Sequence, residues 1–350
     1  MLQKRAILYP VTKENEILLK YSNLVEKVFV IGGLQLEEAV KNSSYETIRS
    51  YDTDRYDMVV IGDGTILNEN MQEKIYSVIT EVVSYKKDLI MLYRINHEQY
   101  ETINNICRKS GVDFDIITGL QVEDNKYLPK IYTINTPIIV VAGINEAIDK
   151  FETQLLLRKY FVNAGYKVSQ IGTKRFSSLF GMYAFPEFMY QDIQEQDKII
   201  RFNTLCKSIE KKENPDIIIV GIPGGIIPIN NEFTNKFGMT AIEIGYSINA
   251  DIMVLNINYD DYADDFYDEM SLLVKYKFNI DSLYFGMTNH KIDFQRSREA
   301  NILRFVTVDM EKIKCKISQN NNVYEVTEYG INELYNKIVE ELSGSDIQII

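Results

Sequence analysis

Short apolar runs alternate along this chain with longer stretches in which apolar residues recur every three or four positions. In the first third, the apolar runs predict strands at 6–9, 28–31, 58–61, 89–92 and 114–117. Helical patterns lie between them and are clearest at 69–83 and 98–110. Runs such as Val59-Val60-Ile61 are typical of strands buried on both faces of a parallel sheet. This alternation predicts βαβ units and an α/β domain of Rossmann or flavodoxin type over residues 1–134.

The same alternation restarts after a polar stretch that contains Pro129 and Pro137, where we place the boundary between two domains. The second domain, 135–350, has predicted strands at 138–142, 167–171, 216–220, 252–255, 283–287 and 303–308. Its predicted helices cover 150–164, 191–210 and 331–342. Gly165 is placed to end the first of these helices. The pattern therefore predicts a second parallel-sheet α/β domain.

The segment between the strand 138–142 and the helix from 150 has the layout of a phosphate-binding loop. Gly143 begins a turn, and Asp149 and Lys150 stand where the helix begins. Such loops bind anions through successive backbone N–H groups and a helix N-terminus. The spacing is one residue longer than Gly-x4-Gly-Lys-Ser/Thr and resembles the Gly-x5-Gly-Lys-Thr of dethiobiotin synthetase and other deviant P-loop proteins. That resemblance implies a deviant P-loop NTPase-like fold for the second domain.

Two residues depart from the chemistry of such a loop. Asp149 replaces a glycine, and Phe151 replaces the Ser/Thr whose hydroxyl holds Mg²⁺. At about 4 Å and an effective dielectric of about 20, a carboxylate repels one phosphate charge by roughly 4 kcal/mol. Thr153 or Glu152 is a replacement candidate for the missing hydroxyl. A loop that no longer hydrolyses nucleotide, weak or altered nucleotide binding and an active NTPase all stay open, as does Asp149 as an ordinary first-turn residue.

Other candidate ligand residues follow the predicted strands. Lys174 and Arg175 come after the strand 167–171 and either hold an anion together with Gly143 and Lys150 or form a solvated turn. Asn289 follows the strand 283–287, where it either reads a base edge or caps the strand. Gly62-Asp63-Gly64 follows the strand 58–61, where such folds place ligands. We favour a simple turn at this position, and a ligand site is the alternative.

A loop rich in glycine and proline, 221–231, follows the strand 216–220. It offers Gly221, Gly224, Gly225 and Asn230 as candidates for contact with a partner, since adjacent glycines allow close backbone approach. Its isoleucines are expected to be exposed, because the loop is too irregular to hide them in a regular element. An ordinary NTPase has a carboxylate at the end of this strand for the Mg²⁺ shell, whereas the strand here carries Asp216 at its start and no carboxylate at its end. A rigid structural loop is the alternative.

Composition narrows the function further. A net charge of −12 and a pI near 4.9 argue against general nucleic-acid binding. Three cysteines and two histidines, all far apart in the sequence, predict no metal site. No apolar run is long enough to span a membrane, and the first residues do not resemble a signal peptide. We therefore expect a cytoplasmic protein without membrane or nucleic-acid partners.

Several segments together resemble the peptide maturation system proteins that accompany radical SAM enzymes in bacterial natural-product clusters. The resemblance covers most of the second domain and patches of the first, at 6–10, 149–158, 165–172, 177–181, 185–189 and 221–225. The segment 18–38 lacks the glycine- and tryptophan-containing motif expected of that family. The resemblance implies an accessory protein that binds the precursor peptide or its modifying enzyme. An ATP-dependent enzyme of the same pathway, which activates a carboxylate or transfers a phosphoryl group with ATP and Mg²⁺, is the alternative.

Overall fold

Contacts between Cα atoms divide the chain into two compact units, 1–119 with 175–181, and 120–174 with 182–350. The computed structural model describes residues 5–12, 15–21, 29–31, 47–48, 51–62, 69–93, 95–122, 130–263, 265–317 and 322–344. The polar stretch predicts a boundary after residue 134, whereas the contacts place 120–134 in the second unit. The backbone N–H of Tyr132 donates to Asn203, and those of Asn135 and Thr136 donate to Glu210. Both acceptors lie on one helix of the second unit.

The first unit contains a parallel sheet in the order β3-β2-β1-β4-β5-β6, which is the strand order of a Rossmann fold. Its strands are β1 (Ala6–Tyr9), β2 (Phe29–Ile31), β3 (Thr47–Ile48), β4 (Met58–Ile61), β5 (Asp88–Met91) and β6 (Phe114–Ile116). Its helices are α1 (Ile17–Tyr21), the short η1 (Thr53–Arg55), α3 (Glu69–Ser84) and α4 (His97–Ser110). A capping box between Asn96 and Gln99 begins α4, and the left-handed Gly111 ends it. The strand order selects Rossmann over flavodoxin topology.

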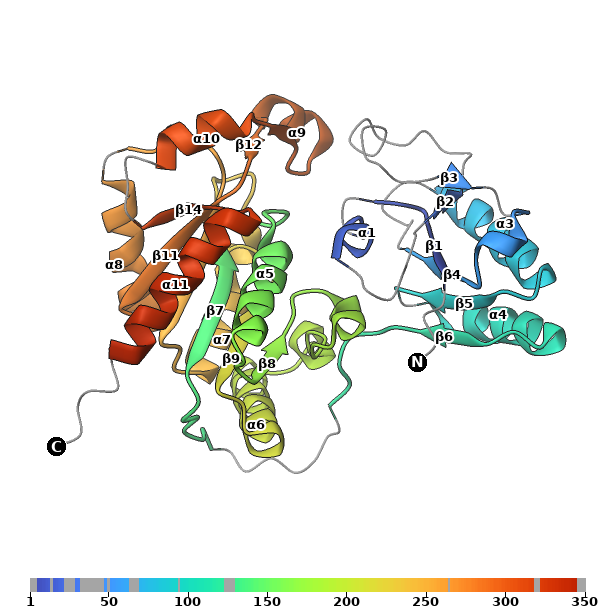
Figure 1. The fold of residues 1–350 in the computed structure, drawn as a ribbon, viewed down its shortest axis with the longest axis horizontal. Helices are drawn as coiled ribbons and strands as arrows, with labels where there is room; N and C mark the ends of the chain where they lie inside the picture. The colour runs from blue at the N-terminus through green and yellow to red at the C-terminus, as the bar shows by residue number, and fades with distance from the viewer. Residues whose placement is uncertain are drawn as a thin grey trace. The chain divides into compact units, whose positions relative to one another are not determined.

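The second unit contains a parallel sheet in the order β14-β11-β10-β7-β9-β8 (Figure 1). Its strands are β7 (Ile138–Gly143), β8 (Val168–Ile171), β9 (Ile217–Gly221), β10 (Ile252–Ile257), β11 (Ser282–Met287) and β14 (Val323–Glu325). The central strands β7, β9 and β10 are buried along their whole length, as expected of strands covered by helices on both faces. Two parallel α/β sheets confirm the predicted fold class.

Helices cover both faces of this second sheet. On one face, α5 (Lys150–Asn163) packs beside α11 (Glu328–Gly344). The other face packs into one apolar core with α6 (Glu195–Glu213), α7 (Met239–Ser247), α8 (Phe266–Phe278) and α10 (Met310–Ile317). Short helices complete the connections, namely η2 (Arg175–Phe180, grouped with the first unit), η3 (Glu187–Tyr190), η4 (Asn235–Gly238) and α9 (Phe294–Ala300).

One predicted strand of the second domain does not join its sheet. The run 303–308 is instead β13 (Phe305–Thr307), which pairs antiparallel with β12 (His290–Ile292) in a separate hairpin. The sixth strand of the sheet is β14, which the pattern did not predict. Only three residues of β14 form the strand, too short a run to stand out from its polar surroundings.

Candidate functional site

The loop between β7 and α5 lies at the carboxyl ends of the central strands, where open parallel sheets bind ligands. Gly143 ends β7 and permits the turn. A Cβ there would lie 2.6 Å from Ile148 Cγ2 and 2.8 Å from Lys150 Cδ, so only glycine fits. The backbone N–H groups of 145–149 donate to no carbonyl in the described part of the chain. The loop thus offers unpaired donors at the beginning of a helix.

Asp149 occupies the glycine position of the loop in a conformation that suits glycine. Its φ is +49°, and that of Ala147 is also +49°. Aspartate tolerates this left-handed region better than most residues do, which explains how the replacement is accommodated. The Asp149 side chain makes no capping hydrogen bond to the helix, so capping does not explain why an aspartate stands here. Its carboxylate is directed elsewhere.

Lys150 begins α5 and is buried, with 6% of its surface exposed. Its Nζ donates to the carbonyl oxygen of Asn145 at 3.1 Å and to that of Gly224. Burial lowers the pKa of this amine to about 7, Glu146 opposes the shift, and Lys174 adds to it. Lys150 and Lys174 therefore lie close enough to interact electrostatically, as the predicted anion site requires.

Thr153 takes part in hydrogen bonds within the second unit. It is fully buried, and its hydroxyl lies between the carbonyl oxygen of Asp149 at 3.3 Å and the amide of Asn256, whose Nδ2 donates to it at 2.8 Å. Asn256 Nδ2 also donates to the carbonyl oxygen of Ile148 at 2.9 Å. These contacts connect α5 to β10, and the role of Thr153 as a replacement for the missing hydroxyl stays a prediction.

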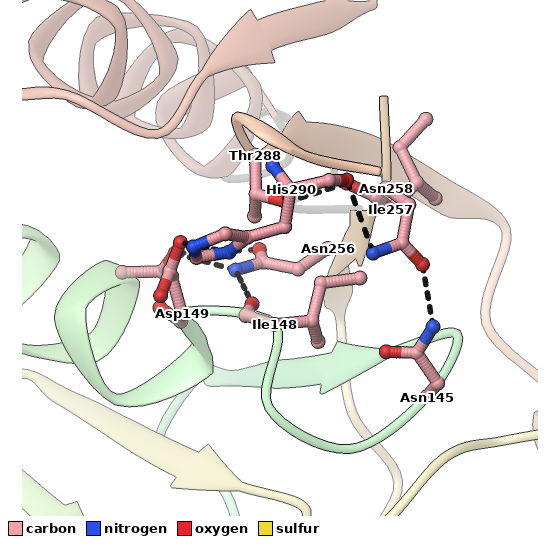
Figure 2. A network of polar contacts seen from close by, with 9 residues as sticks. Asn145, Ile148, Asp149, Asn256, Ile257, Asn258, Thr288 and His290 are labelled. Carbon is pink, nitrogen blue, oxygen red and sulfur yellow. Dashed lines mark hydrogen bonds and ion pairs between the residues drawn. The ribbon is translucent and has the colours of Figure 1, made fainter. Parts of the chain in front are cut away.

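A polar network that the sequence did not predict lies over the loop (Figure 2). His290 Nδ1 is 3.2 Å from Asp149 Oδ2, so the carboxylate turns toward the imidazole. Asn145 Nδ2 donates to Asn258 Oδ1, and Asn258 Nδ2 donates to the carbonyl oxygen of His290 at 3.3 Å. The network joins the loop to the ends of β10 and β11. Its sequence signal was Asn256-Ile257-Asn258 directly after an apolar strand.

Two buried atoms of this network make no hydrogen bond. One is Asn145 Oδ1, on a side chain with no exposed surface. The other is His290 Nδ1, which lies 3.2 Å from Asp149 Oδ2 without the geometry of a hydrogen bond. Buried polar atoms without partners are uncommon and have a cost of about 1–3 kcal/mol each. Both lie beside the donors of the loop, so the site is ready for a ligand with complementary groups.

The glycine- and proline-rich loop after β9 is not the exposed apolar surface that we expected. Ile222 and Ile226 are 1% and 0% exposed. A Cβ on Gly221 would lie 2.4–2.6 Å from the amide of Gln154, and one on Gly225 would lie 2.6 Å from the carbonyl oxygen of Ile144. The missing side chains let this backbone lie against α5 and the phosphate loop, which turns Ile222 and Ile226 inward, whereas Ile227 and Ile229 are half-buried.

The remaining candidates are distributed around this region. Gly224 contributes its carbonyl oxygen to Lys150, and Asn230 accepts from the N–H groups of Glu232 and Phe233 in a turn. Asn289 is half-buried, and its backbone oxygen accepts from Val308, so its base-reading role stays a prediction.

In the first unit, a Cβ on Gly62 would lie 2.0 Å from Asn15 Nδ2, whereas Asp63 and Gly64 lie outside the described residues. Among the described residues, no group of three or more His, Cys, Asp or Glu side chains is arranged to hold a metal ion. The described helices include none with the length and apolar character needed to cross a membrane.

Comparison with known proteins supports the fold. No protein-family model and no curated protein matches the chain. A DUF1611 family protein from Anabaena variabilis is similar in structure over 96% of this chain and 99% of its own, with a TM-score of 0.60 and 12% identity. A plasmid partition protein from Borrelia burgdorferi covers 61% of this chain and all of its own, with a TM-score of 0.36 and 12% identity. A GTPase from Pyrococcus abyssi covers 58% of this chain and 96% of its own, with a TM-score of 0.31 and 12% identity. The likeness to the DUF1611 family protein extends over nearly the whole chain, so it supports an α/β fold for both units.

Proposed function

We propose that the second unit binds a phosphate-bearing ligand at the loop 144–150, without efficient hydrolysis of nucleotide. The observation that carries the proposal is the convergence of unpaired backbone N–H groups, the start of α5 and the buried amine of Lys150 on one loop. These are the groups with which helix N-termini and glycine-rich loops hold anions. A phosphate oxygen would replace the carbonyl oxygens that Lys150 now contacts.

The groups that assist hydrolysis in an NTPase are replaced here. Phe151 is buried where a Mg²⁺-binding hydroxyl would stand. The end of β9, where a carboxylate would complete the metal shell, is Gly221, and the amide of Gln154 fills the space that a side chain would need. Gln154 is fixed there by Ile171 and by the N–H of Thr173. This arrangement favours binding over turnover.

The biological role follows from the sequence resemblance. We propose that the protein acts in the bacterial cytoplasm as an accessory protein in the maturation of a ribosomally made natural-product peptide. It would bind the precursor peptide or the radical SAM enzyme that modifies it, with ligand binding at the loop as the controlling event. The second candidate is an ATP-dependent enzyme of the same pathway, and the contact between Asp149 and His290 favours it, since a carboxylate beside an imidazole is a common proton-transfer pair.

Calorimetric titration with inorganic phosphate and with ATP, each with and without Mg²⁺, tests the binding function. We expect binding to the wild type and at least a tenfold loss in Lys150→Met, with little dependence on Mg²⁺. Lys159→Met is the matched control, because Lys159 lies on the same helix, is largely exposed and pairs with Glu328 at 2.9 Å. Equal affinities for the wild type and Lys150→Met would move the ligand away from this loop. Pull-down of the precursor peptide and its modifying enzyme tests the accessory role separately.

A further inference from the structure

The loop carries hydrogen-bond acceptors beside its anion-binding donors, which an ordinary phosphate loop does not need. One acceptor is the carboxylate of Asp149, whose Oδ1 has no protein partner within the described residues. The other is Asn145 Oδ1, buried and without a hydrogen bond. A fully ionised anion has only acceptors, so it would meet repulsion from both groups. A ligand that suits this loop must bring a donor together with its negative charge.

The orientation of the Asn145 amide is set by its neighbours. Asn258 Nδ2 donates to the carbonyl oxygen of His290, which leaves Asn258 Oδ1 as the acceptor toward the loop. Asn145 therefore turns its Nδ2 to Asn258 and directs its oxygen to the opposite side (Figure 2). An exchange of the two Asn145 amide atoms would place two acceptors against each other. The unpaired oxygen is thus a consequence of the network.

The direction of the Asp149 carboxylate is likewise set by its surroundings. Its Oδ2 lies 3.2 Å from His290 Nδ1, and the backbone of His290 is fixed because its carbonyl oxygen accepts from Tyr259 N at 2.9 Å. The left-handed backbone of Asp149 fixes the start of the side chain. The backbone thus directs the carboxylate, and its Oδ2 faces His290 without a hydrogen bond, so Oδ1 stays available beside the loop donors.

We infer that the loop selects a protonated phosphate group, with Asp149 accepting the hydrogen bond of its P–O–H. The ligand class is a phosphate monoester or free phosphate that retains one proton. Phosphate monoesters have a second pKa near 6, so about half of the molecules keep that proton at pH 6, and free phosphate keeps at least one proton throughout the neutral range. Lys150 and the N–H groups of 145–149 take the ionised oxygens, and Asn145 Oδ1 is available to a second donor of the ligand. Sulfate has a similar size and shape but no proton to donate. This inference rests on the proposed anion-binding function.

The experiment compares inorganic phosphate with sulfate by calorimetry at about pH 6. We expect the wild type to prefer phosphate by at least tenfold. In Asp149→Asn and Asp149→Gly this preference should fall close to one, mainly because sulfate binds more tightly. Both replacements tolerate a positive φ, so the loop backbone is preserved, and the thermal midpoint should confirm it.

Glu146→Gln is the matched control for charge. Glu146 lies in the same loop and interacts electrostatically with Lys150, so its neutralisation should alter the affinities for phosphate and sulfate by a similar factor and leave their ratio unchanged. If the wild type does not discriminate, or if the preference survives in Asp149→Asn, the inference is wrong while anion binding stands. If the ratio falls equally in Glu146→Gln, general charge and not the Asp149 hydrogen bond decides selectivity, which also overturns it. If neither anion nor ATP binds the wild type, the proposed function itself fails.

Discussion

The buried amine of Lys150 gives the second unit a stability that depends on pH in a defined direction. Burial lowers its pKa from 10.5 to about 7, with Glu146 opposing and Lys174 reinforcing that change. At about 1.4 kcal/mol per pKa unit, the charged amine is roughly 5 kcal/mol less favourable in the folded chain than in the unfolded chain. Between pH 7 and 10.5 the unfolded chain holds a proton that the folded chain has released. The free energy of unfolding must therefore rise with pH across this interval.

Lys150→Met removes this contribution and keeps most of the side-chain volume. From the two pKa values, the wild type should gain about 2 kcal/mol of stability relative to the variant between pH 7 and pH 9. At any single pH, the difference in free energy of unfolding between the wild type and Lys150→Met combines two opposing effects. The variant avoids the cost of burying the amine, but it leaves the carbonyl oxygens of Asn145 and Gly224 without their donor, at about 1–3 kcal/mol each. The change in the difference with pH is the informative quantity.

Urea unfolding followed by far-ultraviolet circular dichroism at pH 7 and pH 9 measures this quantity. The chain has two units, so the relevant transition is the one that the substitution shifts. Groups that titrate equally in both proteins cancel in the difference between them. Lys159→Met should give a difference that is constant with pH, because Lys159 is exposed and paired at the surface. If the free energies of unfolding of the wild type and Lys150→Met differ by the same amount at pH 7 and pH 9, within about 0.5 kcal/mol, the buried amine does not have a depressed pKa.

Three further outcomes follow from the same region. Gly221→Ala places a Cβ within 2.6 Å of the Gln154 amide and should lower the free energy of unfolding by about 1–3 kcal/mol. Gly344→Ala is the control, because a Cβ there meets open space and should leave stability unchanged. Equal urea midpoints for the two variants would contradict this packing. Asn256→Ala removes the donor to the carbonyl oxygen of Ile148 and to the Thr153 hydroxyl. It should lower the free energy of unfolding by about 1–3 kcal/mol and speed hydrogen exchange in the loop 144–150. Unchanged exchange would show that the network does not stabilise the loop. Mg²⁺-ATP turnover should stay at the level of buffer, and sustained phosphate release that Lys150→Met abolishes would overturn the non-hydrolytic function.

Much of the fold could be predicted because parallel strands buried on both faces are continuous apolar runs. Strands β1 and β4 have the predicted bounds, and β7 and β10 extend the predicted runs by one or two residues. Helix α5 begins at Lys150, as expected from the loop spacing. Helices α7 and α8 were not predicted. Both carry exposed apolar residues away from their buried faces, such as Tyr246 on α7 and Leu272 and Tyr276 on α8, which weakens the helical period.

The site was only partly predictable because its polar contacts join residues that are distant in the sequence. Gly143, Asp149 and Lys150 stand out from local spacing alone. Asn258 and His290 reach the loop only once β10 is paired with β7 and β11 with β10, and a single histidine after a strand has no distinctive signal. The exposure predicted for the loop after β9 was wrong for Ile222 and Ile226, for a related reason. Glycine permits close packing as readily as exposure, and only the position of Gln154 distinguishes the two.

The departures from an ordinary phosphate loop are integrated into the structure, which argues for a changed role over simple loss of function. Asp149 takes a left-handed conformation and is held toward His290. Phe151 is buried in the unit, and Gln154 fills the space at the end of β9. Each replacement satisfies contacts of its own, so restoring one residue of the usual motif would disturb its neighbours before it restored a metal site. For that reason Asp149→Gly should widen the range of anions that bind without conferring hydrolysis, and recovery of hydrolysis would require positions 151, 154 and 221 to change together.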